Sequence, residues 1–169
     1  MVGLVAKPQL VSSNNKSTGV RYQTEVLSVD LIEEAGAMMQ LHRKELCLHD
    51  DFELDPDWEH YFKASVMGML VICTARQANG KLIGYAAYSV YQNPHYRKVK
   101  NAMQDVLFLH PGKRGLMAGY NLIKFADKHL ASLGVNLVVH HVKVKFDFSP
   151  MLVRLGYQQS EKIFEKRLD

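Results

Sequence analysis

Residues 105–127 read DVLFLHPGKRGLMAGYNLIKFAD, and this stretch decides the expected fold. Residues 105–109 form a compact apolar run, which is typical of a buried strand. Residues 116–133 then repeat apolar side chains at the spacing of an amphipathic helix. The apolar side chains that share one face of this helix are Leu122, Phe125, Ala126 and Leu130. Gly134 follows at a position where helices commonly take a C-terminal cap. The stretch therefore predicts a strand, a basic loop and a long helix.

Two predicted strands precede this stretch and form a hairpin. Residues 69–75 and 82–91 are strand-like runs, and residues 77–80 between them read Gln-Ala-Asn-Gly, a hairpin turn signal. Residues 135–144 are rich in β-branched side chains and predict another strand after the long helix. A strand, a long helix and a further strand in succession predict a parallel pair with a right-handed crossover.

The remaining segments complete one mixed α/β domain over residues 1–169. Asp30 and Glu33 resemble a capping box at the start of the first predicted helix. The other predicted segments are strands over residues 20–26 and 157–168, helices over residues 30–46, after Pro56 and over residues 149–156, and an irregular basic segment over residues 93–101. The fold class that follows is α/β, a single domain with a twisted mixed sheet of about six to seven strands and helices on both faces.

The composition fits one globular domain and excludes several protein classes. The chain has 169 residues, of which 47% are hydrophobic and 22% charged, and these values are near globular averages. No apolar run reaches the roughly 20 residues of a membrane span, and the N-terminus lacks the pattern of a signal peptide. We therefore expect a cytoplasmic protein with no membrane partner, a flexible polar segment over residues 1–19, and buried reduced thiols at Cys47 and Cys73.

The loop between the predicted strand and the long helix has the composition of an anion site. Lys113, Arg114, Gly115 and Gly119 place cations and small residues around the start of a helix. Backbone N–H groups at a helix start point outward, and the helix dipole favours negative charge there. The loop matches neither the P-loop pattern nor the dinucleotide pattern GxGxxG. The alternative is a tight strand–helix turn with surface cations. The net charge of +4 suits an anionic ligand or nucleic acid without choosing between them.

The order of these elements and the loop sequence resemble the GNAT superfamily of acyl-CoA-dependent N-acyltransferases. The pyrophosphate loop of that family reads [RQ]-x-x-G-x-[GA] after the fourth strand, and Arg114, Met117 and Gly119 occupy its defined positions. The resemblance covers nearly the whole chain and implies a splayed central parallel pair. More narrowly, the motifs NPHYRK, DVLFLHPGKRG, VVHHVK, LVRLGY and FEKRL resemble the acetyltransferase-like proteins of tailed bacteriophages, which implies the host cytoplasm as the location.

The resemblance implies acetyl-CoA, or CoA, as the co-substrate between the splayed strands, and no metal. The amine acceptor would attack the thioester directly in a ternary complex. The residues that the resemblance assigns to cofactor binding are Val106, Leu107, Phe108 and Leu109 along the pantetheine arm, and Lys113, Arg114, Gly115, Leu116, Met117, Ala118 and Gly119 around the pyrophosphate.

Two positions depart from the family's pattern. Met117 stands where the motif has its central glycine, so its side chain must point away from the phosphates. Leu152 stands where the family commonly has a tyrosine that protonates the departing thiolate, and leucine has no proton to give. These departures favour coenzyme binding over turnover by the usual acid.

The candidates for acid–base chemistry are Asp105, His140, His141 and Tyr96. Asp105 is expected at the start of its strand, where several GNAT members keep a carboxylate base; the alternative is a structural aspartate bonded to nearby backbone or to Lys100. His140 and His141 are adjacent on one predicted strand, so alternation sends them to opposite faces, and one of them is expected to face the cleft. Each histidine also has a purely structural alternative. Tyr96, in the loop before the strand, would replace the missing acid or contact the acceptor.

Three functions stay open on the sequence. The first is an acetyl-CoA-dependent N-acetyltransferase acting on an amine acceptor of unidentified kind. The second is a degenerate GNAT domain that binds acyl-CoA without catalysis. The third, directed at nucleic acid, is not favoured, because the charge is dispersed and no RNA-binding or zinc-finger signature is present. The sequence leaves open whether the protein forms a homodimer. Trp58, Tyr61 and Phe62 are expected mainly in the core, in a region that often lines the acceptor site of GNAT proteins.

Overall fold

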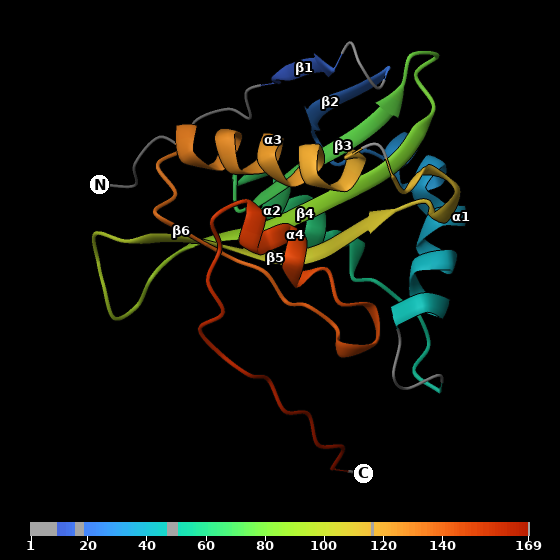
Figure 1. Cartoon of the computed structure of the whole chain (residues 1–169). Coiled ribbons are helices and arrows are strands. Elements are labelled where there is room, and N and C mark those ends of the chain that lie inside the picture. The colour runs from blue at the N-terminus through green and yellow to red at the C-terminus, as the bar shows by residue number, and fades with distance from the viewer. Residues whose placement is uncertain (1–9, 16–18, 47–50, 116, 169) are drawn as a thin grey trace.

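The computed structural model describes residues 10–15, 19–46, 51–115 and 117–168. Its six strands form one sheet in the order β1-β2-β3-β4-β5-β6 (Figure 1). Neighbours from β1 to β5 are antiparallel, whereas β5 and β6 are parallel. The strands are β1 (Ser12–Asn15), β2 (Val20–Glu25), β3 (Leu70–Gln77), β4 (Leu82–Gln92), β5 (Lys100–Leu109) and β6 (Leu137–Val139). The predicted mixed α/β class is confirmed.

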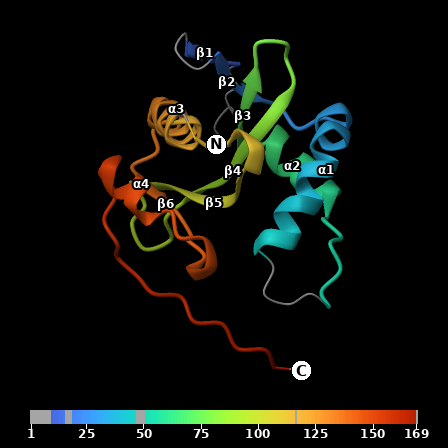
Figure 2. The ribbon, with the colours of Figure 1, turned by 45° about the vertical axis from the view of Figure 1, so that its right-hand side comes forward.

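Helices cover both faces of this sheet (Figure 2). One face carries α1 (Val29–Leu46) and α2 (Trp58–Val66), and the other carries α3 (Ala118–Ser132) and α4 (Ser149–Arg154). Short 3-10 turns occur at η1 (Pro111–Lys113) and η2 (Val144–Phe146). The first helix begins one residue earlier than predicted, because the Ser28 hydroxyl, rather than Asp30, accepts a hydrogen bond from the helix start, at the N–H of Leu31.

Each face of the sheet has its own apolar core. On the α3 side the predicted helix face is confirmed, with Leu122, Phe125, Ala126 and Leu130 all buried in one cluster. Alternation along β3 sends Val71, Cys73 and Ala75 into this cluster, and Leu70 and Ile72 into the cluster beneath α1. Because both faces are covered, β3 is apolar at successive positions rather than alternating. Burial raises the pKa of the Cys73 thiol to about 12, so this thiol is inert at neutral pH; Cys47 lies outside the described residues.

Gly84 marks the closest backbone approach between β4 and β5. A Cβ atom at this position would lie 2.6 Å from Leu109 Cδ1 and 2.8 Å from the carbonyl oxygen of Phe108. We expect Gly84→Ala to lower the free energy of unfolding by about 1–3 kcal/mol, because the backbone of β5 must shift to admit the methyl group. Denaturant unfolding measures this effect.

Gly36 supplies a matched control for that measurement. It lies inside α1, where an added Cβ meets nothing within 4 Å. Gly36→Ala should raise the free energy of unfolding by about 0.5–1 kcal/mol, since alanine loses less entropy than glycine in a helix. Equal destabilisation by both substitutions would contradict the close approach at Gly84.

The predicted start of the strand at residues 105–109 is wrong. β5 begins at Lys100 rather than at Asp105, so Asp105 lies in mid-strand. The predicted irregular segment is correspondingly shorter, and its last residues pair with the long strand β4. The signal was hidden because Lys100 alternates with the buried Asn101, and the Lys100 ammonium reaches back to donate to the carbonyl of Leu133.

The two ends of the described chain also differ from prediction. Residues 12–15, predicted as part of a flexible polar segment, form β1, because an edge strand needs backbone pairing and not apolar side chains. Residues 157–168, predicted as the last strand, form no strand, and after Tyr157 the segment leaves the body of the molecule (Figures 1 and 2). Tyr157 is partly buried, whereas Phe164 and Leu168 are each 89% exposed, so the segment does not alternate between a buried and an exposed face as a strand of the sheet would. As a result the parallel pair, predicted to be central, lies at the edge of the described sheet.

Candidate functional site

The parallel strands β5 and β6 separate after a short paired region. The paired residues are Asn101 with Leu137, Ala102 with Val138, and Met103 with Val139. β5 then continues to Leu109, whereas the predicted strand 135–144 ends at Val139. In the described part of the chain no strand pairs with β5 on this side beyond Met103. The backbone edge of β5 from Gln104 onward, called the slot below, therefore has no strand beside it in the described ranges and is available for pairing with an extended ligand.

A β-bulge at Asp105 turns its side chain toward the face that carries α1 and α2. Ala87 pairs with Val106, but the next pair joins Tyr88 to Gln104, so Asp105 has no partner on β4. Asp105 and Val106 consequently line the same cavity, which strict alternation along a strand would forbid. The bulge thus places an exposed carboxylate beside the slot and directs it into the cavity.

Tyr61 holds this carboxylate from α2. Its hydroxyl donates a 2.8 Å hydrogen bond to Asp105 Oδ2. Burial and this hydrogen bond raise the pKa of Tyr61 to about 12, so the phenol stays protonated and remains a donor near neutral pH. Sequence reasoning assigned Tyr61 mainly to the core and did not connect it with Asp105. The only available signal was its place in an aromatic helix start after Pro56.

The cavity lies between α1, α2 and the sheet, and has a volume of about 380 Å³. Ile32 and Met39, two residues of the predicted α1 periodicity, line it, and Met39 also packs against the core cluster beneath α1. Of the predicted aromatic group, Trp58 and Tyr61 also line it. The imidazole of His42 stacks on Phe108 at 4.9 Å, and burial lowers the pKa of His42, so this ring is neutral at pH 7.

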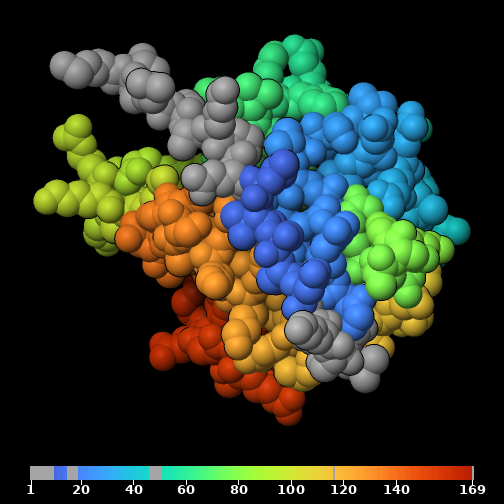
Figure 3. All heavy atoms as spheres, turned by 90° about the horizontal axis from the view of Figure 1, so that it is seen from above, coloured from blue at the N-terminus to red at the C-terminus, as the bar shows by residue number. Residues whose placement is uncertain are grey.

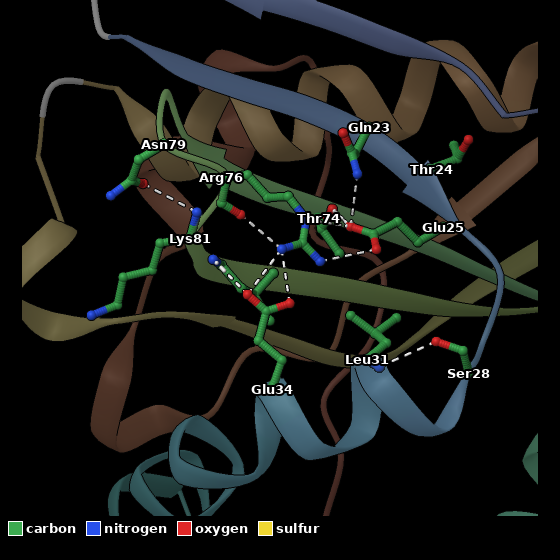
Figure 4. Close-up of polar contacts among 12 residues, drawn as sticks. Gln23, Thr24, Glu25, Ser28, Leu31, Glu34, Thr74, Arg76, Asn79 and Lys81 are labelled. Carbon is green, nitrogen blue, oxygen red and sulfur yellow. Dashed lines mark hydrogen bonds and ion pairs between the residues drawn. The ribbon is translucent and has the colours of Figure 1, made fainter.

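An ion-pair network fixes α1 over the sheet and so sets the width of the cavity (Figure 4). The Arg76 guanidinium lies between Glu25 of β2 and Glu34 of α1, at 2.7 Å and 2.8 Å. Glu34 also accepts a hydrogen bond from the backbone N–H of Leu82. Burial alone would raise the pKa of Glu25, but the hydrogen bonds from Arg76 and Thr74 lower it below its usual value. Glu25 is therefore ionised at neutral pH, and its charge is stabilised by Arg76.

The start of α3 has the backbone geometry of an anion site. No side chain caps the helix, and its N-cap residue Met117 has φ 62°, in the left-handed region. The methionine side chain is 51% exposed. Gly115, before it, has φ 121°. The first-turn amides of α3 are the groups that a helix leaves without intrahelical partners. Leu116, also predicted to bind the cofactor, lies outside the described residues.

The backbone at Met117 explains why the related motif has glycine there. A left-handed conformation costs a non-glycine residue roughly 1–2 kcal/mol, partly offset by the entropy that glycine would lose. We expect Met117→Gly to raise the free energy of unfolding by up to about 1 kcal/mol without weakening any ligand bound at the helix start. Parallel unfolding and ligand titrations check this, and a destabilised variant would contradict the conformational argument.

Arg114, expected at the pyrophosphate, points elsewhere. Its guanidinium forms an ion pair with Glu45 of α1 at 2.7 Å, and its Nε donates to the carbonyl of Leu109. The guanidinium also lies 5.4 Å from the centre of the Phe108 ring. This side chain therefore ties the loop to α1. The amides of Lys113, Arg114 and Ala118 donate to carbonyls within the loop, which leaves the exposed Lys113 ammonium and the amides further along the first turn of α3 to face an anion.

The two histidines lie beyond the end of β6, so strand alternation does not apply to them. His140 Nδ1 contacts Gln104 Oε1 at 2.7 Å, and its ring meets Tyr157 edge-on at 5.0 Å. Burial, and to a lesser degree the charge of His141, lowers the pKa of His140 to about 4, so the ring is neutral at pH 7. Its Nε2 atom is buried without a hydrogen-bond partner. His141 is exposed.

A buried pair behind the slot was missed by sequence reasoning. Tyr157 donates a 2.6 Å hydrogen bond to Asp127 of α3, and burial raises the pKa of both groups. Leu152 is buried nearby in α4, as its apolar side chain requires. Tyr96 is 66% exposed in the loop that precedes β5, at the opposite end of that strand from the α3 loop (Figure 1). The structure therefore does not bring the predicted acid–base residues together. Asp105 faces the cavity on the α1–α2 side, whereas His140 contacts Gln104 and Tyr88, whose ring belongs to the core on the α3 side.

The described part of the chain has neither a membrane-spanning helix nor a metal-binding cluster of side chains. Viewed from above, β1 and β2 lie between α1 and α3, and the β4–β5 loop projects from the body (Figure 3). Within the described ranges, no helix is long and apolar enough to cross a membrane. Among the same residues, no three His, Cys, Asp or Glu side chains are grouped so that they would hold a metal ion.

The sequence matches no family model and no curated protein. Solved structures resemble it at low identity. An aminoglycoside acetyltransferase from an uncultured soil metagenomic sample matches with a TM-score of 0.69 and 15% identity, over 92% of this chain and 100% of that chain. Glucosamine-6-phosphate N-acetyltransferase from Arabidopsis thaliana matches with a TM-score of 0.65 and 16% identity, over 88% and 99%. A predicted acetyltransferase from Clostridium acetobutylicum, solved with acetyl-CoA, matches with a TM-score of 0.64 and 12% identity, over 88% and 96%.

The chain has the GNAT acetyltransferase fold. This confirms the fold that the loop and the element order predicted. The narrower resemblance to proteins of tailed bacteriophages stays a prediction, as do the cytoplasmic location and the homodimer.

Proposed function

We propose that this protein is an N-acetyltransferase that transfers the acetyl group of acetyl-CoA to a primary amine in a ternary complex. One observation carries the proposal: the bulge at Asp105 places a carboxylate between the slot beside β5 and the cavity beneath α1. A thioester in the slot and an amine in the cavity would then meet at one carboxylate. The GNAT fold and the neighbour solved with acetyl-CoA support the choice of co-substrate.

The residues present fit CoA on two counts. In the described ranges no strand pairs with β5 beyond Met103 on the slot side, so backbone groups from Val106 to Leu109 are available for a pantetheine arm, apart from the Leu109 carbonyl, which accepts from Arg114. The uncapped start of α3, with Lys113 exposed in the preceding turn, suits a pyrophosphate. Bound there, acetyl-CoA would supply the activated acetyl carbon, and the protein would supply position and a base.

Asp105 is the base in this proposal. The acceptor enters as an ammonium ion, and Asp105 accepts one proton from it, directly or through water. The free amine then forms the N–C bond to the thioester carbon while the C–S bond breaks. The nitrogen loses its second proton to the departing thiolate, and Asp105 releases its proton to solvent. Tyr61 orients the carboxylate throughout by its hydrogen bond.

His140 is suited to accept a hydrogen bond rather than to supply a proton, because its ring is buried and neutral at pH 7. Its Nδ1 faces an oxygen atom of Gln104, so Nδ1 carries the hydrogen and Nε2 has the lone pair. His140 is therefore proposed as an acceptor beside the slot, with Gln104 fixing its ring. Tyr157 already donates to Asp127. Neither residue replaces the acid that is missing at Leu152, and the proton transfer from nitrogen to sulfur takes its place.

Thermal unfolding with saturating acetyl-CoA tests the proposal. A ligand that binds only the folded protein stabilises it by about 2.7 kcal/mol at a hundredfold excess over Kd. For a domain of this size, the melting temperature should rise by roughly 5–10 °C. ADP, which lacks the pantetheine arm, should give a smaller rise. An unchanged melting curve with acetyl-CoA would overturn the proposal.

The thermal shift also separates the second candidate from the first. The left-handed Met117 and the apolar Leu152 are the features that favour a non-catalytic acyl-CoA-binding module. A clear shift with acetyl-CoA, combined with no acetyl transfer to any amine in a broad screen, would support that module. Release of free CoA that depends on the amine would support the enzyme.

A further inference from the structure

The lining of the cavity beneath α1 indicates which chemical class of amine the cavity accepts. Its wall is built mainly of apolar and aromatic side chains, among them Leu31, Ile32, Ala35, Met39, Trp58 and Tyr85. The polar groups on this wall are largely engaged with one another. Tyr85 Oη pairs with His42 Nδ1 at 3.1 Å, and Thr74 donates to Glu25. Few of these groups are left to bind a polar substrate body.

The charges on the described lining residues are one carboxylate and one guanidinium. The carboxylate is Asp105, and the guanidinium is Arg43, which donates to the carbonyl of Phe52. His42 is neutral at pH 7 because it is buried. The cavity therefore has one anionic group for one cationic nitrogen. Apart from Arg43, which already donates to a backbone carbonyl, the rest of its described wall is uncharged and favours an uncharged body.

We propose that the acceptor is a primary amine with a single positive charge, carried on an apolar and preferably aromatic body. This inference rests on the proposed function. A volume of about 380 Å³ is within the range of small-molecule sites. Removing apolar surface from water contributes roughly 25 cal/mol per Å², so an aryl group gains from this wall.

The same wall disfavours the acceptors named for two of the structural neighbours. An aminoglycoside has several ammonium and hydroxyl groups, and a sugar phosphate has a dianion. Burying such groups against apolar side chains without partners costs several kcal/mol each. The acceptor of this chain therefore differs in chemical class from those of the neighbours with the same fold.

Fluorescence of Trp58 provides a direct binding assay. It is the single tryptophan of the chain, and it lines the cavity. 2-Phenylethylamine should change its emission on binding, both with and without CoA. 2-Phenylethanol lacks the charge and cadaverine lacks the aryl body, so each should bind at least about 10-fold more weakly. A tripeptide with an N-terminal phenylalanine tests whether the aryl amine comes from a peptide terminus rather than from a free small molecule.

Two variants on α1 test whether the wall selects the substrate. Ile32→Glu adds a second carboxylate to the cavity and should lower the affinity for 2-phenylethylamine by about 10-fold or more while raising that for cadaverine. Leu41→Glu is the matched control, because Leu41 is on the same helix, is 40% exposed and does not line the cavity. Its affinities should equal those of the wild type. Asp105→Asn should lower the affinity for 2-phenylethylamine by about 10- to 100-fold.

The binding assay separates this inference from the proposed function. If acetyl-CoA binds and cadaverine or an aminoglycoside is acetylated, but 2-phenylethylamine neither binds nor reacts, the acceptor class is wrong and the enzyme stands. If 2-phenylethylamine binds with the expected variant pattern but acetyl-CoA does not, the cavity assignment stands and the enzyme fails. Equal affinity for 2-phenylethylamine and cadaverine would also overturn the inference.

Discussion

Replacing Asp105 by asparagine should lower the rate of amine acetylation by about 10²–10⁴-fold, the usual contribution of a general base. The substitution keeps the shape of the side chain and its place at the bulge, where Tyr61 donates to it. It removes the charge that accepts the proton. Acetyl-CoA binding should be unchanged, because the thermal shift depends on the β5 backbone and the start of α3.

The pH dependence of this loss distinguishes a base from a structural aspartate. The ammonium of the acceptor releases its proton increasingly as pH rises toward its own pKa, near 10 for alkyl ammonium groups. The ratio of wild-type to variant kcat/KM should therefore shrink between pH 6 and pH 9. Glu33→Gln, an acid-to-amide change at an exposed position of α1, should leave the rate unaltered. If the Asn variant turns over at the wild-type rate across this range, Asp105 has a structural role, and His140 is the next residue to test.

Replacing Arg76 by methionine should lower the free energy of unfolding by about 3–5 kcal/mol, the usual result of removing one partner of a buried ion pair. The side chains of Arg76 and Glu25 are 11% and 18% exposed. Methionine fills much of the volume but leaves the carboxylate of Glu25 without its cation. The loss also releases Glu34, so α1 should pack less firmly over the cavity.

An exposed ion pair provides the control for this measurement. Lys63 and Glu59 on α2 are 68% and 78% exposed, so Lys63→Met should change the free energy of unfolding by less than about 0.5 kcal/mol. Both variants are compared by denaturant unfolding at pH 7. Similar small effects at the two positions would contradict a dependence of the fold on Arg76.

The effect of Arg76→Met should shrink in acid. The folded state lowers the pKa of Glu25, so this carboxylate contributes stability above its unfolded pKa and loses that contribution as pH falls through the folded value. Once the pH falls below the folded pKa, protonated Glu25 no longer requires its cation. The difference in unfolding free energy between wild type and variant should therefore be smaller near pH 3.5 than at pH 7.

Several parts of the site were predictable because they obey local rules. A period of 3.6 residues placed Leu122 and Phe125 on the buried face of α3, and a Gln-Ala-Asn-Gly turn placed β3 beside β4. The loop at residues 113–119 was recognisable as a candidate anion site because its cations and glycines are neighbours in the sequence. The same loop did not reveal the direction of Arg114, because its partner Glu45 is 69 residues away in sequence.

The sequence by itself determined the strand–loop–helix at residues 105–132, the apolar face of that helix and the mixed α/β class, since each depends on neighbours within a few positions. Only the tertiary structure decided where the side chain of Asp105 lies. Its orientation depends on a bulge against β4 and on a hydrogen bond from Tyr61, 44 residues earlier. Tertiary structure likewise left residues 157–168 outside the sheet, although their pattern predicts a strand. Pairing between distant segments depends on which backbone edges and faces are still free once the core has packed, and a local pattern carries no record of that.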